Sequence, residues 1–111
     1  TLGSLVLCAK ADVTEFSALS SKDYKEMGVV IGDIENALSA AFSYEKINYL
    51  MLMMVDPNVH FHVIPRYSEA RTACGITVAD PGWPAVPQLG EAREISRAER
   101  DALREYISGY W

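Results

Sequence analysis

The 111-residue sequence lacks the features of a membrane protein, a disulfide-rich secreted protein or a general nucleic-acid binder. No apolar run reaches the roughly 18 residues that a membrane-spanning helix needs, and no signal peptide is recognisable. Two cysteines, Cys8 and Cys74, are too few for a disulfide framework. The net charge is −5, and no block of Lys and Arg forms a stripe that could follow a phosphate backbone. We therefore expect a cytoplasmic protein with no membrane or nucleic-acid partner.

Length and composition limit the number of domains. Half of the residues are hydrophobic, and 111 residues are enough for one core but marginal for two. We therefore predict a single domain over residues 1–111. The sequence begins at Thr1 rather than Met, which leaves room for an upstream segment.

Hydrophobic periodicity predicts a strand and a long helix in the first part of the chain. Leu5–Cys8 follows Gly3 and reads as a buried strand. The helix should begin near Ser20 or Ser21, because Ser20 and Asp23 have the spacing of a capping box. Its apolar residues recur at intervals of three and four, as expected for a face that packs in a core or a dimer interface. They are Tyr24, Met27, Ile31, Ile34, Leu38 and Ala41.

The rest of the chain predicts a hairpin, a loop-rich tail and a last helix. Residues 47–55 are apolar almost throughout and favour a strand buried on both faces. The residues of Asp56-Pro57-Asn58 are typical of a tight turn, so the strand should fold straight back as a hairpin. The tail covers residues 68–95, where prolines and glycines in 80–90 oppose sheet formation. A capping-box spacing at Ser96 and Glu99 predicts a helix over about 97–108.

Both histidines of the chain lie in one alternating segment, Asn58-Val59-His60-Phe61-His62-Val63-Ile64-Pro65-Arg66. Successive side chains of a strand point to opposite faces, so Asn58, His60 and His62 should share one face. The two imidazoles would then lie roughly 6–7 Å apart, and the apolar residues between them would face the core. The segment predicts a polar ladder on a well-supported central strand.

Spacing alone leaves three interpretations of this ladder open. The histidines could be partly buried structural residues, a His-x-His metal pair, or catalytic groups. A metal site needs further ligands, for which the candidates are Cys8, Cys74, Asp56 and the glutamates. None of them has a recognised ligand spacing such as Cys-x-x-Cys, so we predict no metal and no cofactor.

The segment resembles the signature of the histidine triad superfamily of nucleotide hydrolases and transferases. That signature alternates three histidines with apolar residues and is often followed by Pro-Arg, as in Pro65-Arg66 here. In this register His62 matches the third histidine, His60 the central one, and Asn58 the first. Shifting the register by two would make His62 central, but the match of Val63-Ile64-Pro65-Arg66 would be lost. The order of elements over residues 1–67 also resembles the family, with Ser4 at an early position where histidine is common.

The resemblance implies an α+β fold: a curved antiparallel sheet of about five strands, a long helix packed on it, and usually two protomers in a homodimer. It implies that His60 is the nucleophile, that His62 donates to phosphate, and that Asn58 binds substrate in place of the first histidine. The tight turn at Asp56-Pro57 lacks the longer loop with Gln and Ser or Thr of well-known hydrolases in the superfamily. It therefore resembles a short-hairpin branch.

The chemistry of histidine is also suited to phosphoryl transfer. A histidine is both a nucleophile and a titratable group, and a backbone carbonyl on its far ring nitrogen would fix the tautomer. We expect a hydrolase or nucleotidyl transferase that cleaves at the α-phosphate of a nucleoside 5′-phosphate derivative, such as a dinucleoside polyphosphate, through a nucleotidyl-histidine. The alternatives are a degenerate nucleotide-binding module without turnover, and a metal-binding or structural protein.

Overall fold

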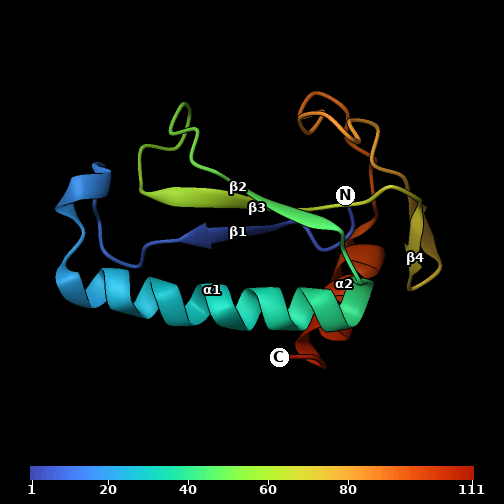
Figure 1. Cartoon of the computed structure of the whole chain (residues 1–111), viewed down its shortest axis with the longest axis horizontal. Coiled ribbons are helices and arrows are strands. Elements are labelled where there is room, and N and C mark those ends of the chain that lie inside the picture. Colours follow the sequence, from blue (N-terminus) through green and yellow to red (C-terminus); the bar gives the residue numbers. More distant parts are fainter.

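A computed structural model describes all residues of the chain, 1–111, and shows an α+β arrangement (Figure 1). The strands are β1 (Leu5–Cys8), β2 (Lys46–Leu50), β3 (His60–Arg66), β4 (Arg71–Ala73) and β5 (Ile76–Val78). The helices are the 3₁₀ turn η1 (Phe16–Ala18), the long α1 (Ser21–Phe42) and α2 (Arg97–Ser108). The predicted class of fold is confirmed.

The five strands form two sheets rather than the single sheet that was expected. One is antiparallel with the order β1-β3-β2, and the other is the short hairpin β4-β5. The hairpin turns at Cys74 and Gly75, whose φ angles of 51° and 74° are both positive, as in the two-residue turns that suit a twisted hairpin. The tail 68–95 is therefore less irregular than predicted, because residues 71–78 pair with each other.

Both predicted helix starts are confirmed. Ser20 accepts a hydrogen bond from the Asp23 backbone and Asp23 reciprocates, and Ser96 and Glu99 repeat the arrangement at α2. Only the second half of the apolar stripe on α1 is deeply buried, through Ile34 and Leu38. None of the helices is both long and apolar enough to span a bilayer.

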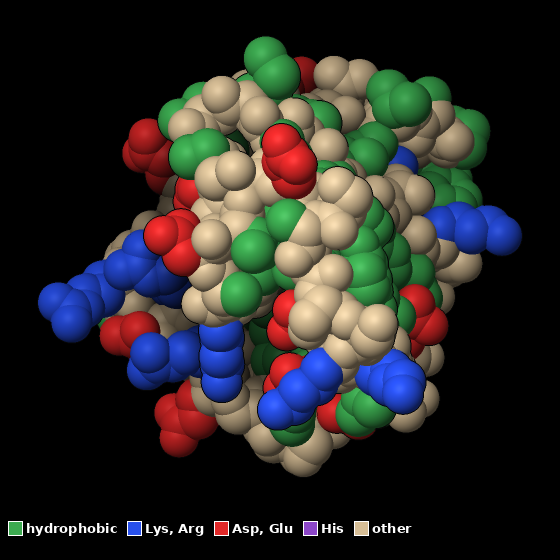
Figure 2. Space-filling view, turned by 90° about the vertical axis from the view of Figure 1, so that its left-hand side faces the viewer, with side chains coloured by type: hydrophobic (Ala, Val, Ile, Leu, Met, Phe, Trp, Pro, Cys, Tyr) green, Lys and Arg blue, Asp and Glu red, His purple; other side chains and the backbone are tan.

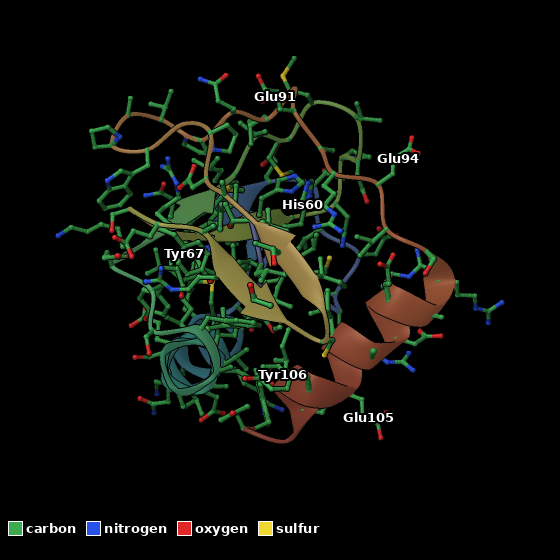
Figure 3. The ribbon with its side chains drawn as sticks, turned by 90° about the vertical axis from the view of Figure 1, so that its right-hand side faces the viewer. His60, Tyr67, Glu91, Glu94, Glu105 and Tyr106 are labelled. Atoms are coloured by element: carbon green, nitrogen blue, oxygen red, sulfur yellow. The ribbon has the colours of Figure 1, made fainter.

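The core lies between the sheet and α1, and α2 closes one end. Val63 of β3 is fully buried beside Leu38, Phe42 and Tyr67. Figure 3 looks along α1 and shows α2 beside it, with Tyr106 toward α1, where its hydroxyl donates to the Ala41 carbonyl. At the other end of the sheet, Phe61 packs edge-on against Phe16 of η1. Val63 and Phe61 thus pack the side of β3 that faces α1 and η1.

The predicted strand over residues 47–55 and its tight hairpin are wrong. β2 ends at Leu50, the partner of His62, and residues 51–59 form an irregular connection. The strand is also not buried on both faces, because no residue of β2 is fully buried. Leu52, Met54 and Val55 are exposed, so extending β2 through these residues would bury no further apolar surface. Asp56 does form a turn, but a local one, in which its carboxylate accepts from the Asn58 backbone. The expected short hairpin is thus replaced by a longer loop.

Candidate functional site

One face of β3 carries the polar side chains of the candidate site. By strand alternation His60, His62, Ile64 and Arg66 share the face that points away from α1. β3 is the central strand, so each histidine has a neighbour in the sheet: Cys8 pairs with His60, and both Val6 and Leu50 pair with His62. The expected central position of the histidines is confirmed. Backbone pairing holds this strand more firmly than a loop would be held.

His60 has one ring nitrogen bonded and the other available. Its side chain is buried, with 8% of its surface exposed, and Nδ1 lies 2.7 Å from the Asn58 carbonyl oxygen. Since a carbonyl only accepts, this contact places the proton on Nδ1 and leaves a lone pair on Nε2 in the neutral ring. Nε2 has no partner in the chain, and no buried side-chain nitrogen lacks one, so Nε2 must reach solvent. The expected backbone partner is therefore present.

His62 is half-buried, and its side chain forms no hydrogen bond within the protein. Its ring centroid lies 5.2 Å from that of His60, with the rings at 76° to each other. The two imidazoles thus meet at one small patch of the sheet, where a single phosphate group could contact both. Figure 2 views the η1 end of the molecule and shows no histidine on the surface there.

Asn58 does not continue the ladder as a free polar group. It lies before β3, and its side-chain amide bridges two backbone groups: Nδ2 donates to the Ala9 carbonyl and Oδ1 accepts from the Val13 amide, each at 3.1 Å. Its contact with substrate stays a prediction. The structure instead brings Asn58 to His60 through its backbone carbonyl.

Arg66 ends the same face, and sequence reasoning did not assign it a contact. Its guanidinium donates to Asp80 at 2.6 Å, to Asn48 at 2.8 Å and to the Ala85 carbonyl at 2.8 Å. Burial alone would raise the pKa of Asp80, but hydrogen bonds from Arg66 and from the Gly82 and Tyr67 backbones hold it below its usual value. Arg66 and Asp80 are 5% and 1% exposed, so this pair fixes residues 80–85 over the sheet.

The fixed loop forms one wall of a cavity beside His62. The cavity has a volume of about 440 Å³, a size that suits part of a small-molecule ligand. Its floor includes Val6, His62 and Ile64, and its loop wall includes Pro87 and Gln88. No Lys or Arg lines it. From the sequence, only the Pro-rich composition of residues 80–90 indicated an ordered loop that could form this wall.

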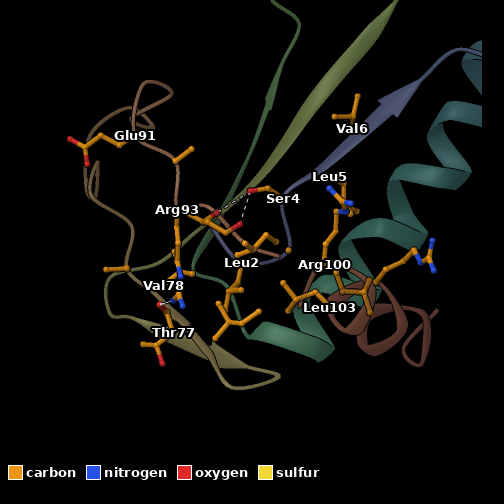
Figure 4. Close-up of a pocket in the computed structure, with 18 of the residues that line it drawn as sticks. Leu2, Ser4, Leu5, Val6, Thr77, Val78, Glu91, Arg93, Arg100 and Leu103 are labelled. Atoms are coloured by element: carbon orange, nitrogen blue, oxygen red, sulfur yellow. Dashed lines mark hydrogen bonds between the residues drawn. The ribbon is translucent and has the colours of Figure 1, made fainter. Parts of the chain in front are cut away.

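A larger cavity of about 1270 Å³ lies between β1, the β4-β5 hairpin and α2 (Figure 4). It shares Thr1 and residues 4–6 with the smaller cavity but includes neither histidine. Chemistry at His60 and His62 therefore concerns the smaller cavity. No group of three or more His, Cys, Asp and Glu side chains is arranged to hold a metal ion.

The fold matches those of known structures. The chain is similar to a histidine triad protein from Sinorhizobium meliloti 1021, with 25% identity, a TM-score of 0.76, and coverage of 97% of this chain and 74% of that one. By its fold, the chain belongs to the histidine triad superfamily. A histidine triad protein from Bradyrhizobium japonicum gives 20% identity, a TM-score of 0.69, and coverage of 97% and 75%. No protein-family model and no curated protein matches the sequence.

Proposed function

We propose that this histidine triad protein is a nucleotide hydrolase or nucleotidyl transferase that cleaves a nucleoside 5′-phosphate derivative, such as a dinucleoside polyphosphate, at its α-phosphate. The observation that carries the proposal is the state of His60. Its Nδ1 is tied to the Asn58 carbonyl at 2.7 Å, while Nε2 reaches solvent beside His62. This is the arrangement that a nucleophilic imidazole requires.

The residues can supply each step of such a reaction. Nε2 of His60 would form a bond to the α-phosphorus while the bond from phosphorus to the leaving oxygen breaks, and that oxygen takes the electron pair. The imidazole becomes cationic, and its Nδ1–H bond to the Asn58 carbonyl strengthens with that charge. His62, when protonated, would donate to a phosphate oxygen. Water, or another acceptor, would then displace His60 from phosphorus.

The cavity beside His62 indicates which part of the substrate lies there. Its lining combines apolar side chains with Ser4, Gln88 and the acidic Asp80 and Glu91, and it includes no Lys or Arg. The Arg66 guanidinium is already bonded to Asp80, Asn48 and Ala85. A chain of phosphates would lose its water there without gaining cationic partners. We propose that the cavity holds an uncharged part of the substrate, while the reacting phosphate lies at the two histidines.

A second candidate is a nucleotide-binding module without turnover. It is favoured by Asn58, which stands at the position of the first triad histidine. An amide can donate a hydrogen bond but cannot carry a charge. Its amide group also has two backbone partners already.

Two measurements test these candidates. Isothermal titration with adenosine monophosphate reports binding, and chromatography of a reaction with diadenosine tetraphosphate reports turnover. Binding with release of adenosine monophosphate supports the hydrolase, and binding without turnover supports the module. Absence of both would contradict the proposed nucleotide site.

We also propose that the protein is a homodimer. The first half of the stripe on α1 is only partly covered within one chain, since Tyr24 is 36% exposed and Met27 is half-buried. A second copy would bury this surface through an isologous contact. Light scattering at micromolar concentration should give twice the mass of one chain, and a 12.3 kDa species alone would contradict the dimer.

A further inference from the structure

Asn58 and Val59 are tied to the segment that follows β1 by four hydrogen bonds. Two come from the backbone: Ala9 donates to the Val59 carbonyl at 3.0 Å, and Val59 donates to the Val13 carbonyl at 2.9 Å. The other two come from the Asn58 amide, which joins the Ala9 carbonyl and the Val13 N–H. The two segments are therefore fastened at the residues that immediately precede His60.

The orientation of the Asn58 carbonyl depends on this fastening. Residues 51–58 have no regular structure, so no sheet ladder fixes the peptide plane between Asn58 and Val59 from the loop side. The side-chain amide of Asn58 and the Val59 backbone hold the plane from both of its ends. The carbonyl is then aimed at His60 Nδ1.

The chemistry of the bridge explains why an amide stands here. Its partners are one carbonyl and one N–H, so a single planar group must both donate and accept. Aspartate of the same shape would place a carboxylate oxygen against the Ala9 carbonyl, and alanine would leave both backbone groups without a partner. Of the side chains of this size, only asparagine meets both demands.

We infer that Asn58 is a positioning residue for His60: its side chain fixes its own carbonyl, and that carbonyl keeps the imidazole in the tautomer with the proton on Nδ1. Asn58 thereby acts through His60 and not through contact with substrate. The importance of this for catalysis rests on the proposed function, but the effect on the tautomer does not.

The test measures the tautomer directly. Long-range ¹H–¹⁵N NMR spectra of the whole chain near pH 8 distinguish a protonated Nδ1 from a protonated Nε2 in each neutral histidine. Spectra of the wild type should show His60 with its proton on Nδ1. Asn58→Asp and Asn58→Ala should both shift His60 toward the other tautomer, and His62 should not follow.

A charge-matched control is available in Asn48→Asp. Asn48 accepts from Arg66 through Oδ1, and an aspartate retains that acceptor. This variant adds the same charge as Asn58→Asp, but Asn48 lies on β2 and takes no part in the bonds to Ala9 and Val13. It should therefore leave the His60 tautomer unchanged. Thermal unfolding of each variant verifies that the chain is folded where spectra are compared.

The activity of the same variants separates the two roles of Asn58. As a positioning residue its loss should lower kcat about 10–100-fold, the range known for outer partners of metal-bound histidines, with KM little changed. Asn58→His should also lower kcat, whereas a direct donor to phosphate would tolerate or profit from histidine.

The outcomes are distinguishable. A His60 tautomer that stays on Nδ1 in both Asn58→Asp and Asn58→Ala would overturn the inference, whatever happens to activity. A shifted tautomer in a protein that binds and cleaves no nucleotide would support the inference and contradict the proposed function.

Discussion

The two ends of β3 use polar residues on the same sheet face in opposite ways. At one end every branch of the Arg66 guanidinium has a partner, and the pair with Asp80 is almost fully buried. At the other end His60 keeps Nε2 unbonded, and the His62 side chain forms no hydrogen bond within the protein. A fully satisfied network rigidifies a structure, whereas unbonded groups with solvent access are free to meet a ligand. The strand thus joins an anchored end to a reactive end.

This contrast predicts that substitutions at the reactive end change activity without changing stability. His60→Ala should lower turnover on the order of 10⁴-fold, because the covalent route is lost while the backbone ladder remains. His62→Ala should be milder, about 10²-fold, because it removes one donor to the phosphate. Steady-state kinetics and thermal unfolding measured together check both. Equal and small losses in the two variants would mean that His60 is not the nucleophile.

At the anchored end, stability should change instead. Arg66→Met keeps an unbranched apolar stem but leaves Asp80 buried without its partner, so we expect a loss of about 3–5 kcal/mol. Arg97→Met is the control, because Arg97 is 88% exposed and its pair with Asp101 is long, at 3.9 Å. Urea unfolding should show almost no change in the control. Similar values for both variants would remove the distinction between the two ends.

Gly82 tests whether the loop over residues 80–90 depends on the close approach of the Gly82 and Val86 backbones. A Cβ built on Gly82 would lie 2.3 Å from the Val86 carbonyl oxygen, which is backbone and cannot move cheaply. Gly82→Ala should therefore cost about 1–3 kcal/mol and displace the cavity wall. Gly90→Ala has open space around its Cβ and should be nearly neutral. If both unfold at the same urea concentration as the wild type, the loop is not held as described.

The smallest expected effect is a pH dependence of the anchored end. The pKa of Asp80 is lowered in the folded protein, so its contribution is present above the unfolded pKa of about 4 and is lost as the pH falls through the folded value. The free energy of unfolding should differ most between wild type and Asp80→Asn near neutral pH. The difference should shrink below about pH 4. A difference that is constant from pH 7 to pH 2 would show that folding does not lower the pKa of Asp80.

The early end of β2 illustrates why the sequence-based prediction of a longer strand was wrong. Residues 51–55 are as apolar as the strand before them, yet Met54 and Val55 are 85% and 96% exposed. Apolar composition is a signal of burial only where another element is present to cover it. The same holds for Asn58, where alternation predicted a shared face but hydrogen bonds to Ala9 and Val13 determined the role of the amide.

The sequence by itself determined the local features of this protein. Capping residues defined both helix starts, alternation placed the histidines on one strand, and the motif indicated the superfamily, because each of these depends on residues close in the chain. The tertiary structure alone decided the partners of Arg66, the cavity beside His62 and the hydrogen bonds that tie Asn58 to Ala9 and Val13. Each of these joins segments that are distant in sequence, and such contacts follow from how the chain packs rather than from any local pattern.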